Sequence, residues 1–112
     1  MSKIALLITG RAKPGKRAEV FELYMKHAAP RVSAEEGIEL VTWSEDGQDA
    51  DRYVIFEVLA ANLYGKITQS DWFKEYGRAA SELQAEPPSV QRLTPLFAKG
   101  IDVDAAPATA AI

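Results

Sequence analysis

The hydrophobic residues of this chain follow two different periods, which together predict an alternation of strands and helices. Residues 3–11 are apolar at alternate positions on both sides, and so are residues 51–58. Short runs rich in β-branched and aromatic residues favour buried strands. In the second run the side chains alternate between two faces, with Tyr53, Ile55 and Glu57 on one and Val54, Phe56 and Val58 on the other. We therefore expect two interior strands that need cover on both faces.

Between these two strands the period changes to that of a helix. From Lys16 onward the apolar positions share one helical arc, which comprises Val20, Phe21, Leu23, Tyr24, His27 and Ala28. Pro14-Gly15 predicts a turn before this helix. Pro30 should end it near residues 27–29, because the residue before a proline avoids helical geometry. The pattern predicts an amphipathic helix of about four turns.

The remaining chain adds two strands and two helical segments. A strand at 38–45 is joined to the strand at 51–58 by a short polar turn, so the two should form an antiparallel hairpin. A short helical piece is expected at 60–69. A longer helix should begin at Ser70-Asp71 and end before Pro87-Pro88, with its apolar positions at Trp72, Phe73, Tyr76, Ala80 and Leu83. Extended structure returns at 89–98, where Pro95 favours a sheet edge.

This order of elements is the ferredoxin-like βαββαβ pattern, an α+β fold with a four-stranded antiparallel sheet. Two long helices can cover only one face of such a sheet. The other face would expose half of the apolar strand residues, and a large exposed apolar patch normally marks an interaction surface. A twofold homodimer can close one sheet on the other, because each copy offers the same patch. We therefore expect a dimeric α+β barrel.

Length and composition limit the partners. The chain has 112 residues, of which 47% are hydrophobic, enough for one domain with a modest core. We expect that domain at 1–100 and an alanine-rich tail at 101–112. A net charge of -3 gives no basic field for nucleic acid. No apolar run approaches the roughly 20 residues that span a bilayer. The absence of cysteine is compatible with a reducing compartment, and we expect a cytoplasmic protein that does not bind membranes.

Four short motifs resemble the antibiotic biosynthesis monooxygenase family across residues 3–98. They are Lys13-Pro14-Gly15-Lys16, Glu35-Glu36-Gly37, the strand at 51–57 and Ser70-Asp71-Trp72-Phe73. The resemblance implies that molecular oxygen oxidises a small aromatic substrate, a quinol or polyketide-like phenol, without metal or flavin. An electron-rich phenolate can itself reduce O₂, so such a protein need only bind it in a dry pocket, favour its deprotonation and stabilise the anion.

The chain departs from this family at two places. Many members read Glu-x-Trp where this chain reads Glu57-Val58-Leu59. Many also carry a histidine shortly before the Ser-x-x-Phe stretch, where this chain has Lys66-Ile67-Thr68. In the haem-degrading branch of the family that histidine binds the iron. Because the whole chain has one histidine and no cysteine, we expect no haem, no metal ion and no other cofactor.

His27 and Glu57 are the candidate catalytic residues. The titration range of His27 suits a general base, although a histidine in the last turn of a helix more often serves the helix end. Glu57 is an acid on an otherwise apolar strand, so it is either a base with a raised pKa or half of an ion pair. Its possible partners are Arg11, Arg52 and Arg92. Because the resemblance includes this glutamate across members of differing chemistry, the ion pair is the favoured interpretation.

The expected substrate site is an aromatic pocket between helices and sheet, lined by Tyr24, Trp43, Tyr64, Trp72 and Phe73. Aromatic residues at helical spacing are more often ordinary core. Two alternatives to a monooxygenase therefore stay open. One is a non-catalytic barrel that binds a small hydrophobic ligand or supports a partner, and the other is an isomerase on the same fold. A pocket with a polar group at its base would favour catalysis, and a filled interior would favour the non-catalytic protein.

Overall fold

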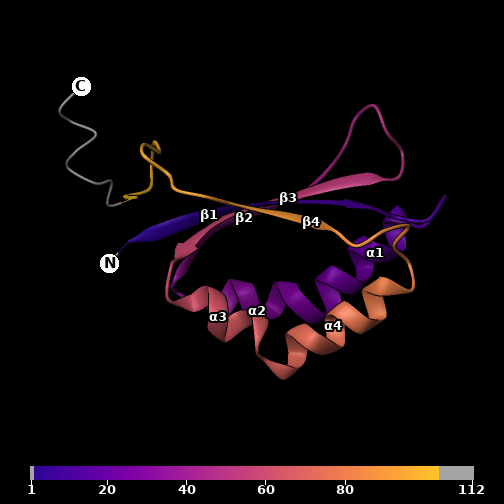
Figure 1. Cartoon of the computed structure of the whole chain (residues 1–112), viewed down its shortest axis with the longest axis horizontal. Coiled ribbons are helices and arrows are strands. Elements are labelled where there is room, and N and C mark those ends of the chain that lie inside the picture. Colours follow the sequence, from indigo (N-terminus) through magenta and orange to yellow (C-terminus); the bar gives the residue numbers. More distant parts are fainter. Residues whose placement is uncertain (1, 104–112) are drawn as a thin grey trace.

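The computed structural model describes residues 2–103, which form one sheet with helices on one side (Figure 1). The antiparallel sheet has four strands in the order β2-β3-β1-β4. The strands are β1 (Lys3–Arg11), β2 (Ile38–Glu45), β3 (Arg52–Ala60) and β4 (Ser89–Leu93). The predicted ferredoxin-like α+β fold is confirmed. Most of the predicted tail, residues 104–112, lies outside the described residues.

Strand β3 lies in the interior of the sheet, between β2 and β1, as its apolar pattern predicts. Its two faces divide as expected: Tyr53 and Ile55 are buried beneath the helices, whereas Val54 and Phe56 are partly exposed on the opposite face. Within residues 2–103, strand β4 pairs with β1 alone and is exposed along its length, so it is an edge strand. It ends at Leu93, so the extended structure expected as far as residue 98, including Pro95, is not part of the strand.

The first helical region differs from the prediction. It comprises α1 (Arg17–Leu23), the π-helix η1 (Tyr24–Ala28) and α2 (Ala29–Ala34), so the helix does not end at Pro30. Pro30 instead lies in the first turn of α2, where a proline is tolerated because that turn needs no N–H donor. The π-helix η1 lies directly before this turn, and in it the Ala29 N–H donates to the Tyr24 carbonyl. The helical region is therefore continuous from α1 through η1 to α2.

The second helical region comprises α3 (Leu63–Thr68) and α4 (Asp71–Ser81). Helix α4 begins as predicted, but the Ser70 hydroxyl donates to the Ile67 carbonyl at 2.6 Å instead of capping the helix. It also ends earlier than expected, because the following residues pair with the end of β1. The Lys13 N–H donates to the Leu83 carbonyl and the Ala85 N–H to the Arg11 carbonyl, both at 2.8 Å. None of the helices within residues 2–103 is long and apolar enough to cross a membrane.

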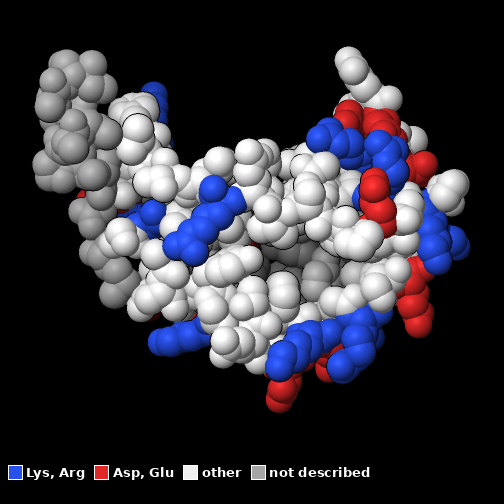
Figure 2. Space-filling model, viewed as in Figure 1, with Lys and Arg blue, Asp and Glu red and all other residues white. Residues whose placement is uncertain are grey.

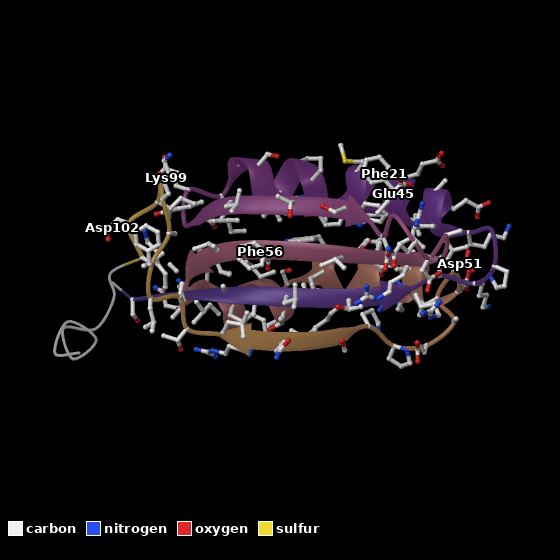
Figure 3. All side chains as sticks on the ribbon, turned by 90° about the horizontal axis from the view of Figure 1, so that it is seen from above. Phe21, Glu45, Asp51, Phe56, Lys99 and Asp102 are labelled. Carbon is white, nitrogen blue, oxygen red and sulfur yellow. The ribbon has the colours of Figure 1, made fainter. Side chains whose placement is uncertain are left out.

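Among residues 2–103, only the segment after β4 covers the face of the sheet opposite the helices, and it does so at one end (Figure 3). The segment after β4 crosses that end, where the Lys3 ammonium donates to the Asp102 carbonyl and Val103 is buried. The centre of this face carries Phe56. The crossing segment also exposes two large side chains, Leu96 at 54% and Phe97 at 85%.

The core near the β2–β3 hairpin is built around the ring of Tyr53, which is 1% exposed. The Trp43 ring stacks on it at 4.9 Å with an angle of 7° between the planes. Gly10 is its cross-strand partner on β1, and a Cβ at that position would lie 2.2 Å from the Tyr53 Cζ. The absence of a side chain at Gly10 therefore makes room for the tyrosine.

Replacing Gly10 by alanine should lower the free energy of unfolding by about 1–3 kcal/mol, because the added methyl group overpacks the site of Tyr53. Denaturant unfolding measures this change. Gly65→Ala is the matched control, because a Cβ on Gly65 in α3 meets nothing within 4 Å. That control should be neutral or stabilising by up to about 1 kcal/mol. Equal effects of the two substitutions would contradict the packing explanation.

Candidate active site

A cavity of about 560 Å³ lies between the helices and the sheet. Small-molecule sites typically measure about 300–1,000 Å³. Figure 2 shows this side of the molecule hollowed, with uncharged residues around the hollow. Residues of β1 and β3 form the floor, and aromatic residues of η1 and α4 form much of the wall, namely Tyr24, Trp72, Phe73 and Tyr76.

Glu57 supplies the carboxyl group on the cavity floor. Its cross-strand neighbours, Leu6 on β1 and Val41 on β2, are both apolar. Burial in these surroundings raises the pKa of the Glu57 carboxyl above its ordinary value. A raised pKa makes the carboxylate form of Glu57 a stronger base than an ordinary glutamate.

The arginines expected to pair with Glu57 are placed elsewhere. Arg11 pairs with Asp49 at 2.6 Å, and Arg52 pairs with Asp46 at 2.8 Å. Arg92 is exposed on the edge strand. No ion pair of Glu57 is found within residues 2–103. Glu57 is partly buried, and a carboxyl in such a place without a counterion is uncommon, because burial disfavours its charged form.

Two tyrosines of the helical regions, Tyr24 and Tyr76, line the same cavity. The rings of Tyr24 and Tyr76 meet edge to face at 6.1 Å. Burial, and then the nearby charge of Glu57, raises the pKa of Tyr24 to about 12. Burial, followed by the proximity of Tyr53 and Tyr24, also raises the pKa of Tyr76. Both hydroxyls therefore stay protonated at neutral pH and serve as uncharged hydrogen-bond donors.

Gln84 adds an amide to the cavity wall. The pairing of residues 83–85 with the end of β1 holds this side chain over Tyr53, where its Nε2 donates to the Tyr53 hydroxyl. Gln84 is 8% exposed, and its Oε1 has no hydrogen-bond partner within the described chain. The buried Tyr24 hydroxyl also lacks one. Buried polar groups are normally paired, so these two atoms are exceptions among the residues around the cavity.

The structure brings some of the sequence-predicted site residues together and leaves others apart. Tyr24, Glu57, Trp72 and Phe73 line the cavity. Trp43 lies behind its wall, stacked on Tyr53, and Tyr64 packs in the separate cluster around Leu6 and Leu59. His27 does not line the cavity, and its ring lies 6.4 Å from that of Tyr76. Gln84 was not expected in the cavity, because no local sequence pattern marks it as buried.

The part of the chain that the structure describes contains no cluster of three or more histidine, cysteine, aspartate or glutamate residues that could hold a metal ion. The groups that are present can accept a proton at Glu57 and donate hydrogen bonds from Tyr24 and Tyr76. Their surroundings are mainly apolar and aromatic, which strengthens electrostatic interactions within the cavity.

Comparison with known proteins finds the fold in solved structures. No family model and no curated protein sequence matches this chain. A protein of Caulobacter crescentus, named as a candidate antibiotic biosynthesis monooxygenase, superposes with a TM-score of 0.79 at 22% identity, covering 86% of this chain and 92% of its own. A protein of Chloroflexus aurantiacus with the same name superposes with a TM-score of 0.75 at 20% identity, covering 90% and 100%.

A structure from Mycobacterium tuberculosis gives a TM-score of 0.75 at 22% identity, covering 88% of this chain and 100% of its own. Each of these likenesses spans most of both chains. They confirm, for the fold, the resemblance to antibiotic biosynthesis monooxygenases that the sequence motifs indicate. The chain therefore has the fold of these proteins.

The raised pKa of Glu57 predicts how stability depends on pH. Between the ordinary glutamate value of 4.5 and the raised value, the folded chain binds more protons than the unfolded chain. The contribution of Glu57 to stability therefore falls as the pH rises through this window, and it stays low above it. Glu57→Gln should raise the melting temperature at a pH of about 8 and have little effect at a pH of about 4.

Thermal unfolding across this pH range tests the prediction, with Glu75→Gln on the exposed surface of α4 as the control. The control should leave the melting temperature unchanged at both ends of the range. A Glu57→Gln variant that is less stable at neutral pH would show instead that the carboxylate has a stabilising partner.

Proposed function

We propose that this protein is a cofactor-independent oxygenase that acts on a small hydroxylated aromatic, a quinol or polyketide-like phenol. The observation that supports this function is the unpaired Glu57 carboxyl on the floor of a cavity walled by aromatic rings. Flat aromatic substrates suit such walls. The solved structures of the same fold that are named as candidate antibiotic biosynthesis monooxygenases favour the same reaction class.

In this mechanism Glu57 is the general base. Its carboxylate takes the proton of a substrate hydroxyl, whose ordinary pKa is near that of tyrosine at about 10. The raised pKa of Glu57 narrows the difference between the two groups and makes the transfer less unfavourable. The hydroxyls of Tyr24 and Tyr76 can then donate hydrogen bonds to the phenolate oxygen.

The phenolate then supplies the electrons that reduce O₂. For a phenol oxidised to a quinone, one oxygen atom enters the ring and the other leaves as water with two hydrogen atoms of the substrate. The protein contributes a dry, oriented site and a place for the proton. An isomerase would use the same carboxyl to move a proton within its substrate, but it would consume no oxygen.

Replacing Glu57 by glutamine should lower the rate of oxygen consumption by about 10²–10⁴, which is the usual contribution of a general base. Oxygen uptake with a panel of hydroxylated naphthalenes and anthracenes first identifies the best substrate, which then serves for the steady-state comparison. Glu75→Gln, an exposed acid on α4, should retain the full rate.

The His27→Ala variant separates the two catalytic candidates in the same assay. Because His27 does not line the cavity, we expect a smaller loss in His27→Ala than in Glu57→Gln. The reverse order would assign the proton transfer to His27. Full activity in both variants would leave binding in a dry site as the source of catalysis and would reject general-base assistance by either residue.

We propose in addition that two copies assemble through the sheet face that carries Phe56. Val54 and Phe56 are partly exposed there, and the helices lie on the other side. In Figure 1 the segment after β4 and the β2–β3 loop both rise on this side of the sheet, at opposite ends. A second sheet of the same shape would cover the apolar surface between them.

Phe56→Arg should therefore convert a dimer to a monomer, because it places a charge within the apolar sheet contact. Sedimentation or light scattering at micromolar concentration measures the mass. Met25→Arg is the matched control, since Met25 is 48% exposed on the helical side. A wild-type protein that is monomeric at every concentration would contradict the proposed assembly.

A further inference from the structure

We infer that the cavity accepts uncharged hydroxyarenes and excludes those that carry a carboxylate. This inference rests on the proposed function and narrows its substrate class. The reaction that supplies the substrate must then leave no free carboxylate on it, by removing the group or by esterifying it.

The charges around the cavity are the first basis for this inference. Of the residues that the structure describes, no lysine, arginine or histidine lines the cavity, and the acidic residues that do are Glu57 and Glu86. Glu86 lies within 3.7 Å of the Arg11 side chain and is exposed to solvent. Glu57 therefore remains as the one charged group within the cavity that has no counterion among residues 2–103.

The proposed proton transfer conserves that single charge. When the Glu57 carboxylate takes a proton from a neutral hydroxyl, the negative charge moves to the substrate. The cavity then still contains a single negative charge. A carboxylated substrate would bring a second negative charge into the same apolar space. Two like charges in a desolvated site are strongly unfavourable without a cation between them.

Hydrogen-bond polarity favours the same ligands. The Glu57 carboxylate on the cavity floor is an acceptor. A ligand hydroxyl can donate to it, whereas a ligand carboxylate has only acceptors. An uncharged donor in the cavity wall would not neutralise an anion.

One cation packs against the outside of the cavity wall. The Arg31 guanidinium of α2 lies over the Trp72 ring, 5.9 Å from its centre, and Arg31 does not line the cavity. If this side chain were to reach a bound carboxylate, the exclusion would fail. Arg31→Gln therefore belongs in the test.

The test uses three air-stable ligands of similar shape: 2-naphthol, 6-hydroxy-2-naphthoic acid and the methyl ester of that acid. Isothermal titration calorimetry at a pH of about 7.5 gives their dissociation constants. We expect 2-naphthol and the ester to bind with similar affinity and the acid to bind at least about tenfold more weakly, as expected for unpaired like charges. The ester controls for the size of the added group.

The variants identify the residue responsible. Glu57→Gln should bring the affinity for the acid to within about threefold of that for the ester, because the resident charge is gone. Glu75→Gln should leave the difference unchanged. Equal binding of acid and ester to the wild-type protein would overturn the inference. So would an ester as weak as the acid, which would indicate exclusion by size, or a selective loss of acid binding in Arg31→Gln.

The binding experiment separates this inference from the proposed function. If the neutral ligands bind selectively but no phenol or quinol of the panel consumes oxygen, the oxygenase is rejected and the charge selection stands. If acid and neutral substrates are oxidised with equal efficiency, the oxygenase stands and the charge selection is rejected. A failure of all three ligands to bind would reject both.

Discussion

The interior strands of this sheet are apolar on both faces, while the helices cover one. This difference between the two faces determines which face can hold a small ligand and which can contact another protein. On the helical side the aromatic rings of η1 and α4 do not fill the space above β3, and a cavity remains over Glu57. On the other side Phe56 lies on a face that has cover at one end only. One side of the sheet is thus suited to a small ligand and the other to a protein surface.

The surroundings of the Glu57 carboxyl affect both the stability of the fold and the chemistry that this group can perform. A buried carboxyl without a counterion destabilises the fold when it is ionised, because water no longer solvates its charge. The same lack of solvation gives it an affinity for protons that a solvated glutamate lacks. The surrounding tyrosines do not compete for this role, since burial keeps Tyr24 and Tyr76 protonated. Among the described residues that line the cavity, Glu57 is thus the candidate proton acceptor and the tyrosines remain neutral, a division that suits proton abstraction followed by stabilisation of an anion.

Sequence periodicity predicted the features that depend on neighbours along the chain. Alternating residues placed β1, β2 and β3 within a residue or two of their observed bounds, and Glu57 was notable as an acid on the otherwise apolar strand β3. The early end of α4 was not predicted, because it follows from hydrogen bonds between residues 83–85 and the end of β1. The same long-range pairing buries Gln84, so its place in the cavity is equally absent from the local pattern.

The position of His27 shows a second limit of sequence analysis. Helical periodicity assigned this residue to the border of the apolar arc, which does not decide whether its ring enters the cavity. The helix that carries it also changes from α to π geometry at Tyr24, and a pattern of 3.6 residues per turn does not represent that change. The prediction that Pro30 ends the helix was wrong, because the proline lies in the first turn of α2 and the helical region continues to Ala34.

The wider turn of η1 makes the shape of the cavity depend on the number of residues in the helix as well as on their identity. Tyr24, Ala28 and Val32 all line the cavity at intervals of four residues. In a regular α-helix each such interval advances by about 40° around the axis, so the three side chains would drift from a common wall. A π turn takes up one more residue per turn and reduces this drift. Insertion or deletion of a single residue near Tyr24 would thus change the shape of the cavity without replacing any residue that lines it. Such a change could alter ligand preference in a way that point substitutions do not.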